Sequence, residues 1–444
     1  MTSPQGAGRH VSGGPEGMGE AHTVGHRPMP VDLAGWLAWL ESRNATQITL
    51  GLERVAAVWG RLGLTLTLPV ITVAGTNGKG STCAFLEAML RAGGYRVGLY
   101  TSPHLIRYNE RIRIDGDAVS DADLCAAFAA VESVREDIPL SYFEQGTLAA
   151  LWLFARAGLD AMVLEVGLGG RLDAVNILDA DCAVITPVDL DHQTWLGQDR
   201  EQIGREKAGI TRPGRPLVCS DPQPPATVRA TAAMPTLFLG QQFRVEPEDD
   251  GRWACRIGET IFPALPRPSL LGAHQYHNAA AALTALWQLR ARLPLPVVAL
   301  RAGMVQAQVA GRFQVVGQAP LRILDVAHNP HAARTLATQL ADLPPTGKRI
   351  AVCALLGDKD LAGVVAALRS SFDVWHIAPL NGERAGPVSA LAETLVAAGC
   401  TSLNHISVTE AWRTACREAG PADTIAAFGS FHTIAEVLQS IRAE

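Results

Sequence analysis

The stretch Ile71-Thr72-Val73-Ala74-Gly75-Thr76-Asn77-Gly78-Lys79-Gly80-Ser81-Thr82 decides how the first part of this chain folds. A β-branched apolar run ends at three closely spaced glycines, and an alanine- and leucine-rich helical pattern begins at Cys83. In such a strand–loop–helix unit, backbone N–H groups and the helix N-terminus face an anion, and Lys79 adds a mobile charge. The spacing departs from the common G-x-x-x-x-G-K-S/T pattern, because Gly80 separates Lys79 from the first hydroxyl. The stretch predicts a nucleotide-binding loop, and the alternative is a glycine-rich turn without a ligand.

The composition is that of a globular α/β enzyme. Of the 444 residues, 48% are hydrophobic and 18% are charged, and the net charge is −5. These values exclude a general electrostatic attraction to nucleic acid or to an anionic membrane. The eight cysteines show no C-x-x-C spacing, which is typical of thiols in a reducing compartment. No apolar segment reaches membrane-spanning length. We therefore expect a cytoplasmic protein with neither nucleic-acid nor membrane partners.

Two alternating α/β units follow a polar N-terminal tail. Residues 1–28 are rich in Gly, Pro, His and Ser, without the apolar centre of a signal peptide. Short β-branched runs then alternate with alanine-rich helical stretches to about Leu289, which predicts a mostly parallel sheet with crossover helices. A second alternating unit begins near Gly311, and we expect a site where the two units meet.

The predicted fold class is α/β, with a P-loop ATPase domain and a smaller Rossmann-like domain. In the first unit we predict buried strands over residues 96–100, 161–166 and 182–187, and in the second over 321–326, 349–355, 374–378 and 424–428. An irregular, partly β insert is expected over residues 236–262. The predicted domains are a disordered tail (1–30), an ATP-binding domain (31–294), a linker (295–310) and a C-terminal domain (311–444).

Polar residues stand where several predicted strands end, and ligands of open α/β sheets bind at those ends. Ser102 follows one such strand, Glu165 ends another and His192 follows a third. Glu165 is a candidate Mg²⁺ ligand, because burying an unpaired carboxylate is costly. A helix cap or an ion pair is the alternative for Glu165. An ordinary turn explains Ser102 and His192 at least as well, if each is taken alone.

Lys207 lies between polar and apolar neighbours, just before a proline-rich turn. A lysine there is usually a solvated charge that complements the helix dipole. If it is partly buried, its amine can lose a proton and become a nucleophile, even toward CO₂. In the second unit, Arg312 stands beside the linker and could clamp a nucleotide phosphate. Asp325 and His328 follow one predicted strand and Ser430 follows the last, although each also fits a turn.

Taken together and in order, these motifs resemble the folylpolyglutamate synthase/dihydrofolate synthase family of the Mur ligase superfamily. The matching segments are residues 75–81, 101–105, 165–173, 191–192, 206–210, 311–312, 325–330 and 429–432. The resemblance extends from about Leu33 to the C-terminus, and it is closest to the bifunctional bacterial members around residues 142–147 and 354–360. It implies an ATP-dependent amide ligase. ATP would phosphorylate a carboxylate of 7,8-dihydropteroate or of a reduced folate, and the amine of L-glutamate would attack the acyl phosphate.

The resemblance also implies roles for individual residues. The expected ATP contacts are Thr76, Asn77, Gly78, Lys79, Gly80, Ser81, Asn278, Arg312 and Asp325. Two Mg²⁺ ions would be held by Ser102, Glu165 and His192, and a monovalent cation is a further cofactor that the resemblance allows. The expected catalytic residues are Lys79, His192, Lys207 and His328, with Lys207 carbamylated so that a cation becomes a carboxylate-like group. The expected substrate contacts are Ser141, Tyr142, Phe143, Glu144, Leu172, Asp173 and Ala174 for the pterin side, and Ser430 for glutamate.

Some alternatives remain open at this stage. Val175 stands where the family usually has threonine, and Ser141 where the bifunctional members often have it, and both positions bear on the pterin side. Folylpolyglutamate synthase activity alone is one alternative function. A phosphate-loop NTPase or kinase is another, although it leaves the second domain and Lys207 unexplained. A peptidoglycan-type Mur ligase is rejected, because Gly80 intervenes after Lys79 and few residues precede the first helix–strand unit. We expect a monomer.

Overall fold

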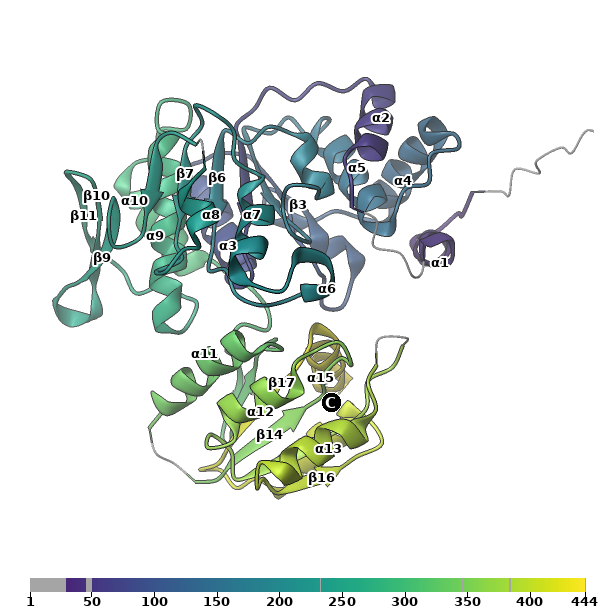
Figure 1. The fold of residues 1–444 in the computed structure, drawn as a ribbon, viewed down its shortest axis with the longest axis vertical. Coiled ribbons are helices and arrows are strands. Elements are labelled where there is room, and N and C mark those ends of the chain that lie inside the picture. Colours follow the sequence, from purple (N-terminus) through teal and green to yellow (C-terminus); the bar gives the residue numbers. More distant parts are fainter. Residues whose placement is uncertain (1–28, 45–49, 232, 345–346, 383–384, 444) are drawn as a thin grey trace, which may run out of the picture.

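The computed structural model describes residues 29–44, 50–231, 233–344, 347–382 and 385–443. The predicted tail therefore lies outside the described residues, apart from Met29 and Pro30. Figure 1 shows two α/β domains, one above the other, and the larger one comes first in the chain. Among the described residues, no helix is long and apolar enough to cross a membrane.

The first domain is built on an eight-stranded sheet with the order β4-β3-β2-β5-β1-β6-β7-β8. Its parallel strands are β1 (Val70–Ala74), β2 (Val97–Tyr100), β5 (Ala161–Glu165), β6 (Cys182–Ile185), β7 (Leu217–Cys219) and β8 (Thr236–Phe238). Two short antiparallel strands, β3 (Ile112–Ile114) and β4 (Asp117–Ala118), extend one edge. The predicted mostly parallel sheet is confirmed.

Helices cover both faces of this sheet, which is why its strands are apolar throughout. Alternate β1 residues point to opposite faces, so that Ile71 and Val73 belong to one core cluster and Val70 and Ala74 to the other. The first face packs against α3 (Lys79–Ala92), α9 (Ala273–Gln288) and α10 (Val297–Gln306). The second is covered by α1 (Leu33–Asn44), α4 (Asp121–Arg135), α5 (Tyr142–Phe154), α7 (Arg200–Ala208) and α8 (Ala226–Arg229), with α2 (Glu53–Leu62) packed outside α4 and α5.

The predicted insert is a separate antiparallel sheet of three strands, β9 (Phe243–Pro247), β10 (Trp253–Ile257) and β11 (Thr260–Leu265). Its buried side chains, among them Phe243 and Trp253, join the core on the α9 face. The insert begins later than predicted, because residues 236–238 form β8 at the edge of the large sheet.

The expected linker is wrong for most of its length, because α10 occupies residues 297–306 of the 295–310 stretch. This helix packs tightly on α3, and a Cβ atom at Gly303 would lie only 2.4 Å from the backbone of Met89. Pro296 is the N-cap residue, so the helix starts only two residues into the expected linker. The chain therefore crosses between the domains only after α10.

The second domain has a six-stranded sheet with the order β12-β13-β17-β14-β15-β16. Its strands are β12 (Gln314–Gln318), β13 (Leu321–Leu324), β14 (Arg349–Cys353), β15 (Val374–Ile377), β16 (Ser402–Asn404) and β17 (Thr424–Phe428), and only β12 is antiparallel. One face carries α11 (Pro330–Ala341), α12 (Leu361–Leu368) and α13 (Val388–Ala397), and the other carries α14 (Val408–Glu418) and α15 (Phe431–Ala443). The four predicted strands are present, and the two edge strands β12 and β16 were not predicted.

Candidate active site between the two domains

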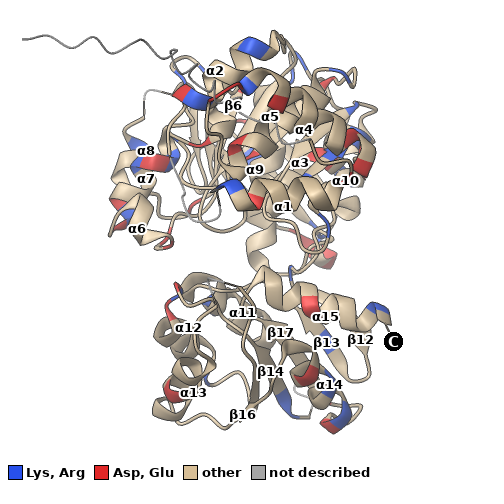
Figure 2. Cartoon of the chain, turned by 90° about the vertical axis from the view of Figure 1, so that its right-hand side faces the viewer, with Lys and Arg blue, Asp and Glu red and all other residues tan. Residues whose placement is uncertain are grey.

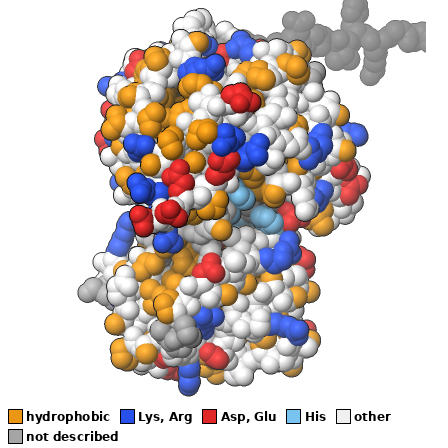
Figure 3. Space-filling model, turned by 90° about the vertical axis from the view of Figure 1, so that its left-hand side faces the viewer, with side chains coloured by type: hydrophobic (Ala, Val, Ile, Leu, Met, Phe, Trp, Pro, Cys, Tyr) orange, Lys and Arg blue, Asp and Glu red, His pale blue; other side chains and the backbone are white. Residues whose placement is uncertain are grey.

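A cavity of about 340 Å³ lies where the domains meet. Figure 3 shows histidine side chains at this junction, between the two lobes of the surface. One wall comes from the loop after β1, a second from α9, and a third from the start of the second domain and α11. The lining includes Asn77, Gly78, Ser81, Arg200, Asp221, His274, Gln275, His277, Asn278, Arg312, Asp325, His331 and Thr335.

The loop between β1 and α3 has the shape that an anion requires. Gly78 has φ 91°, a conformation that favours glycine, and a Cβ atom there would lie 2.8 Å from Oδ1 of Asn278. The Nζ of Lys79 donates to the carbonyl oxygens of Gly75 (3.2 Å) and Thr76 (3.3 Å), so that the ammonium lies along the loop. The N-terminus of α3 begins at Lys79 and adds positive potential.

Glu165 ends β5, beside Val73 of β1, and its side chain is almost wholly buried at 4% exposure. Its Oε2 accepts a hydrogen bond from the backbone N–H of Ser102 at 3.2 Å. Burial raises the pKa of this carboxyl, although the charge of Lys79 opposes the shift. A carboxylate that is buried with few donors around it is a suitable ligand for a divalent cation.

His192 lies at the start of the short helix α6 (Gln193–Leu196), in the loop after β6. Burial lowers the pKa of its imidazole to about 4, although neighbouring Asp191 opposes the shift. The ring is therefore neutral near pH 7, as a metal ligand must be. Among the described residues, no three His, Cys, Asp or Glu side chains gather as a metal cluster. The predicted set contains only Glu165 and His192 of those types, which fits an ion that keeps water and phosphate ligands.

Lys207 lies on α7 and is 4% exposed. Its Nζ donates to the carbonyl oxygen of Gly75 at 2.9 Å, so that it lies directly behind the loop. Burial, reinforced by the charge of Lys79, lowers the pKa of this amine to about 7. A large part of the amine is therefore uncharged at neutral pH, which is the form that reacts as a nucleophile.

The second domain brings a cation and a carboxylate to the cavity. Arg312 lines it, with the guanidinium 5.6 Å from the ring centroid of Phe431. Asp325 lies at the end of β13, and its two oxygens accept the backbone N–H groups of Phe313 and Ala327, each at 2.8 Å. Burial raises the pKa of Asp325, although Arg312 opposes the shift. These bonds fix the carboxylate at the cavity wall.

Asp191 was not among the predicted site residues, yet it connects the two domains. Its Oδ1 accepts from Nζ of Lys359 at 2.9 Å, and its Oδ2 lies 3.6 Å from Nε2 of His328. Burial acts to raise the pKa of Asp191, but the hydrogen bond with His328 and the neighbouring His192 and Lys359 hold it well below its ordinary value. The predicted catalytic residue His328 therefore lies at the domain junction.

The two predicted pterin-side segments come together in the first domain. Phe143 packs in one apolar cluster with Ala174, which begins the 3₁₀ turn η2 (Ala174–Ile177), and its ring covers Gly167. The ring of Tyr142 lies 5.7 Å from the guanidinium of Arg111. Leu172 is part-exposed nearby, and its carbonyl oxygen accepts from the N–H of Gly51.

Several of the predicted substrate contacts also make structural hydrogen bonds or ion pairs within the first domain. Ser141 and Glu144 form a capping box at the start of α5, and Glu144 also pairs with Arg54 at 2.8 Å. The Ser-x-x-Glu spacing is a capping-box signal that can be recognised in the sequence alone. Asp173 accepts the N–H groups of Leu168 and Val175. These three side chains hold the start of α5 and the loop after β5 in shape.

Ser430 is buried, and its hydroxyl is engaged within the second domain. Its Oγ accepts the N–H of Thr433 at 3.0 Å and shares a hydrogen bond of 2.7 Å with Thr433 Oγ1. The structure thus gives Ser430 a capping role at α15. The serine-to-threonine spacing of three residues is the local signal for it.

On the α9 side of the cavity, sequence reasoning predicted Asn278 but missed His274 and His277. His274, His277 and Asn278 stand at positions i, i+3 and i+4, so one helix face presents all three to the cavity. The positions of the lysines are a further sequence signal for this site. The chain has only four lysines, and three of them, Lys79, Lys207 and Lys359, lie around the domain junction.

The phosphate-type loop of one α/β domain faces a second α/β domain across the cavity, and the family match of the second domain makes this arrangement that of a Mur-type ligase. Residues 311–431 match the family described as "Mur ligase, glutamate ligase domain". The chain is 47% identical to the dihydrofolate synthase/folylpolyglutamate synthase of Escherichia coli (strain K12), over 93% of this chain and 96% of that protein. It is 34% identical to the protein of that name from Mycobacterium tuberculosis (strain H37Rv), over 86% and 85%. The chain therefore belongs to the dihydrofolate synthase/folylpolyglutamate synthase family.

Solved structures agree with this assignment. E. coli FolC in complex with DHPP and ADP superposes with a TM-score of 0.88 at 46% identity, over 93% of this chain and 98% of that chain. A bifunctional folylpolyglutamate synthase/dihydrofolate synthase with Mn, AMPPNP and L-glutamate bound gives a TM-score of 0.86 at 44% identity, over 94% and 100%. The predicted fold class and family are thereby confirmed.

Proposed function

We propose that this protein is an ATP-dependent ligase that joins L-glutamate to 7,8-dihydropteroate, forming dihydrofolate, and to the glutamate tail of reduced folates. The observation that carries the proposal is the cavity between the domains. The phosphate-type loop forms one of its walls and Arg312 with Asp325 another, while Glu165 and Lys207 lie against the loop. The similar proteins named above bind ADP, DHPP, AMPPNP, Mn and L-glutamate in their crystals.

In the proposed reaction, a substrate carboxylate oxygen attacks the γ-phosphorus of ATP and ADP leaves. The amine of L-glutamate then attacks the acyl carbon, inorganic phosphate leaves, and the amine loses its proton. Residues 75–81 bind the triphosphate through their N–H groups, and Lys79 stabilises the charge that develops on the transferred group. Asn278, Arg312 and Asp325 bind the rest of the nucleotide from the opposite walls.

The residues around Glu165 fit a divalent cation, because a buried carboxylate with a raised pKa gains from a positive partner. We assign Ser102, Glu165 and His192 to two Mg²⁺ ions, which supply charge neutralisation at the phosphates. Lys207 is assigned as carbamylated. Its amine has a pKa of about 7 and reacts with CO₂ by forming an N–C bond and releasing a proton. The product is an anion in place of a cation beside the loop.

On the pterin side, we assign Phe143 and Tyr142 as the flat surfaces that a heterocycle stacks on, with Leu172 beside them. Ser141, Glu144, Asp173 and Ala174 support that surface through the capping bonds and packing described above. His328 is assigned to the glutamate side, because it lies in the second domain and faces the junction. Ser430 supports the same side by capping α15.

The domain layout proposed for this function places the ATP-binding domain at 31–306 and the crossing at 307–310. The glutamate ligase domain follows at 311–444, and the family match begins at the same residue, 311. The position of α10 on α3 supports the shift of the first boundary. A monomeric state and a monovalent cation rest on the family resemblance alone. A cytoplasmic location rests on composition and cysteine usage.

The test is to incubate the protein with Mg²⁺-ATP and L-glutamate plus either dihydropteroate or tetrahydrofolate, and to identify the products by mass. Both acceptors should gain glutamate, with one ADP formed per amide bond. Extension of tetrahydrofolate alone would reduce the function to folylpolyglutamate synthase. ADP formation that does not depend on an acceptor would favour an NTPase. Lys79→Ala should abolish the reaction, whereas Lys348→Ala, at an exposed lysine remote from the site, should not.

A further inference from the structure

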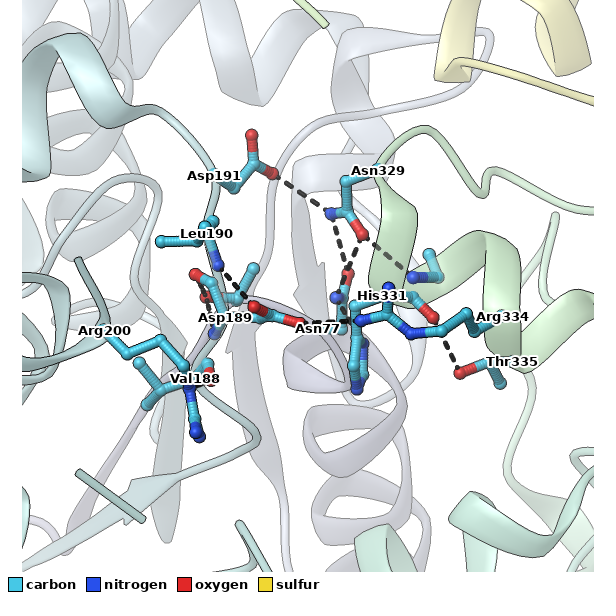
Figure 4. A network of polar contacts seen from close by, with 12 residues as sticks. Asn77, Val188, Asp189, Leu190, Asp191, Arg200, Asn329, His331, Arg334 and Thr335 are labelled. Carbon is cyan, nitrogen blue, oxygen red and sulfur yellow. Dashed lines mark hydrogen bonds and ion pairs between the residues drawn. The ribbon is translucent and has the colours of Figure 1, made fainter. Parts of the chain in front are cut away.

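Asn329 occupies a position where one side chain contacts both domains. It is the N-cap of α11, and its Oδ1 accepts the N–H of Ala332 at 2.9 Å. Its Nδ2 lies 3.3 Å from Oδ1 of Asn77 and 3.3 Å from Oδ2 of Asp191. The residue is only 3% exposed. Figure 4 shows this amide between the two loops of the first domain.

The two loops that Asn329 joins carry different parts of the site. Asn77 belongs to the loop after β1, and Asp191 directly precedes His192 in the loop after β6. β1 and β6 are neighbours in the sheet, so both loops leave the same edge side by side. Within the first domain, Thr76 already joins the bases of the two loops through hydrogen bonds with Pro187 and Asp189. The Asn329 amide adds a bridge from the second domain farther along both loops, at Asn77 and Asp191.

Neighbouring contacts reinforce this arrangement from the same side. Asn77 Nδ2 lies 2.8 Å from Nδ1 of His331, in the first turn of α11, and 3.4 Å from Oδ1 of Asn329. Asp191 also accepts from Lys359 at 2.9 Å. Individually, hydrogen bonds of this kind contribute only about 1 kcal/mol each, so the contact can form and break during turnover.

We propose that Asn329 is a positioning residue for the ligation reaction, one that sets the phosphate loop and the His192 loop in their working arrangement when the second domain docks. The inference rests on the proposed function, and it adds a residue with no assigned contact to nucleotide, metal or substrate. Its action is indirect: the amide donates to Asn77 and Asp191, and these two loops carry the groups that touch the reactants.

Asn329→Ser is the discriminating variant. Serine is an equally good N-cap, so its hydroxyl keeps the bond to the N–H of Ala332, but it has no amide to reach Asn77 or Asp191. We expect kcat to fall at least ~10-fold, while the melting temperature stays within about 2 °C and ADP affinity within about 3-fold. Ser407→Asn is the matched control, because Ser407 caps α14, which lies on the far side of the second domain. This control should leave kcat unchanged.

A rescue experiment separates positioning from a general loss of structure. Asn329→Asp keeps a capping oxygen but turns a carboxylate toward Asp191, and we expect a larger loss of kcat than for Asn329→Ser. Combining Asn329→Asp with Asp191→Asn restores this hydrogen bond with the roles exchanged: the amide at position 191 now donates to the carboxylate at position 329. The double variant should regain at least ~5-fold in kcat over Asn329→Asp alone.

Small-angle scattering of the ADP-bound protein gives a readout that does not need catalysis. Asn329→Ser should be more expanded than the wild type, while Ser407→Asn should scatter as the wild type does. An inactive wild type would overturn the proposed function, and the scattering difference would still test Asn329. The proposal is overturned if Asn329→Ser keeps wild-type kcat, or if its loss of kcat comes with a matching loss of melting temperature and the double variant shows no rescue.

Discussion

The Nζ of Lys207 lies 2.9 Å from the carbonyl oxygen of Gly75 and ties α7 to the first glycine of the phosphate-type loop. An ammonium in this place would be buried beside a second one, Lys79, and both effects lower the pKa of Lys207, to about 7. The protein thus holds a reactive amine at the back of the loop. Carbamylation would remove the like-charge repulsion and leave an anion beside the loop.

Replacing Lys207 by alanine should lower kcat at least ~100-fold and change ADP affinity only a few-fold, because the loop and Lys79 remain. Steady-state kinetics and calorimetric ADP binding measure the two effects. Lys348→Ala is the control at an exposed lysine. Full activity of Lys207→Ala would refute the assigned role.

Carbamylation itself has a spectroscopic test. Protein equilibrated with ¹³C-bicarbonate above pH 7 should show a carbamate carbon signal that is absent from Lys207→Ala. Below the pKa of about 7 the amine is increasingly protonated, so the signal and the activity should both fall as the pH drops, and added bicarbonate should restore them. A signal that persists in Lys207→Ala would place the carbamate elsewhere.

Gly78→Ala should weaken ADP binding at least ~10-fold. The substitution forces a side chain into a left-handed conformation and puts its Cβ 2.8 Å from Oδ1 of Asn278 at the cavity wall. Gly94→Ala is the matched control, because Gly94 also has a positive φ, 85°, but no atom within 4 Å of the added Cβ. The Gly94→Ala variant has a similar backbone strain, but away from the site. It should therefore lose some stability and keep the ADP affinity of the wild type. Equal binding by both variants would contradict the role of the loop.

The sequence allows the local parts of this site to be predicted, and the reason is visible at β1 and Glu165. A β-branched run that stops at glycines defines a strand, its loop and the next helix within a dozen residues. A carboxylate at the end of an apolar strand is likewise readable, and Glu165 lies there in the structure. Such signals depend on neighbours in sequence.

Contacts between distant segments could not be predicted in this way. The bond between Asn329 and Asp191 depends on how two domains dock, and no periodicity or spacing records that. The error at α10 has a related cause, since its helix is stabilised by packing on α3 rather than by a strong local pattern. Ser430 stands at a strand end, as predicted, and its capping bond with Thr433 is a local feature that the prediction did not include.

Three buried histidines should each lower the stability of the protein without nucleotide or metal as the pH is lowered from 6.5 toward 4, while buried carboxyls with raised pKa values, Glu165 and Asp325 among them, act in the opposite direction. His104, His192 and His274 each have a pKa lowered to about 4, mainly because burial disfavours the imidazolium. The unfolded chain, with ordinary values near 6.5, binds protons in this window that the folded protein does not. Each histidine therefore lowers the free energy of unfolding by up to about 1.4 kcal/mol for each pH unit below 6.5.

Urea unfolding at a series of pH values measures this slope. His104→Gln should reduce this slope by the contribution of about one proton, because a glutamine does not titrate. Its side-chain oxygen can still accept the hydrogen bond from Arg111. An unchanged slope in His104→Gln would show that His104 is already protonated in the folded protein over this pH range.

Glu165→Gln should stabilise the protein while abolishing turnover. Without a cation, the buried carboxylate is penalised in the folded state, as its raised pKa indicates, so a neutral amide should raise the melting temperature by a few degrees, about 1 kcal/mol. Glu87→Gln is the matched control, because Glu87 is buried too but pairs with Arg113. Breaking that pair leaves a part-buried guanidinium without its partner, so this variant should lose stability, by about 2 kcal/mol.

Thermal unfolding with and without Mg²⁺-ADP measures the stability of both variants. The stabilisation by Mg²⁺-ADP should shrink in Glu165→Gln and persist in Glu87→Gln. Destabilisation by Glu165→Gln would mean that the carboxylate already has a partner in the folded protein and is not held ready for a cation.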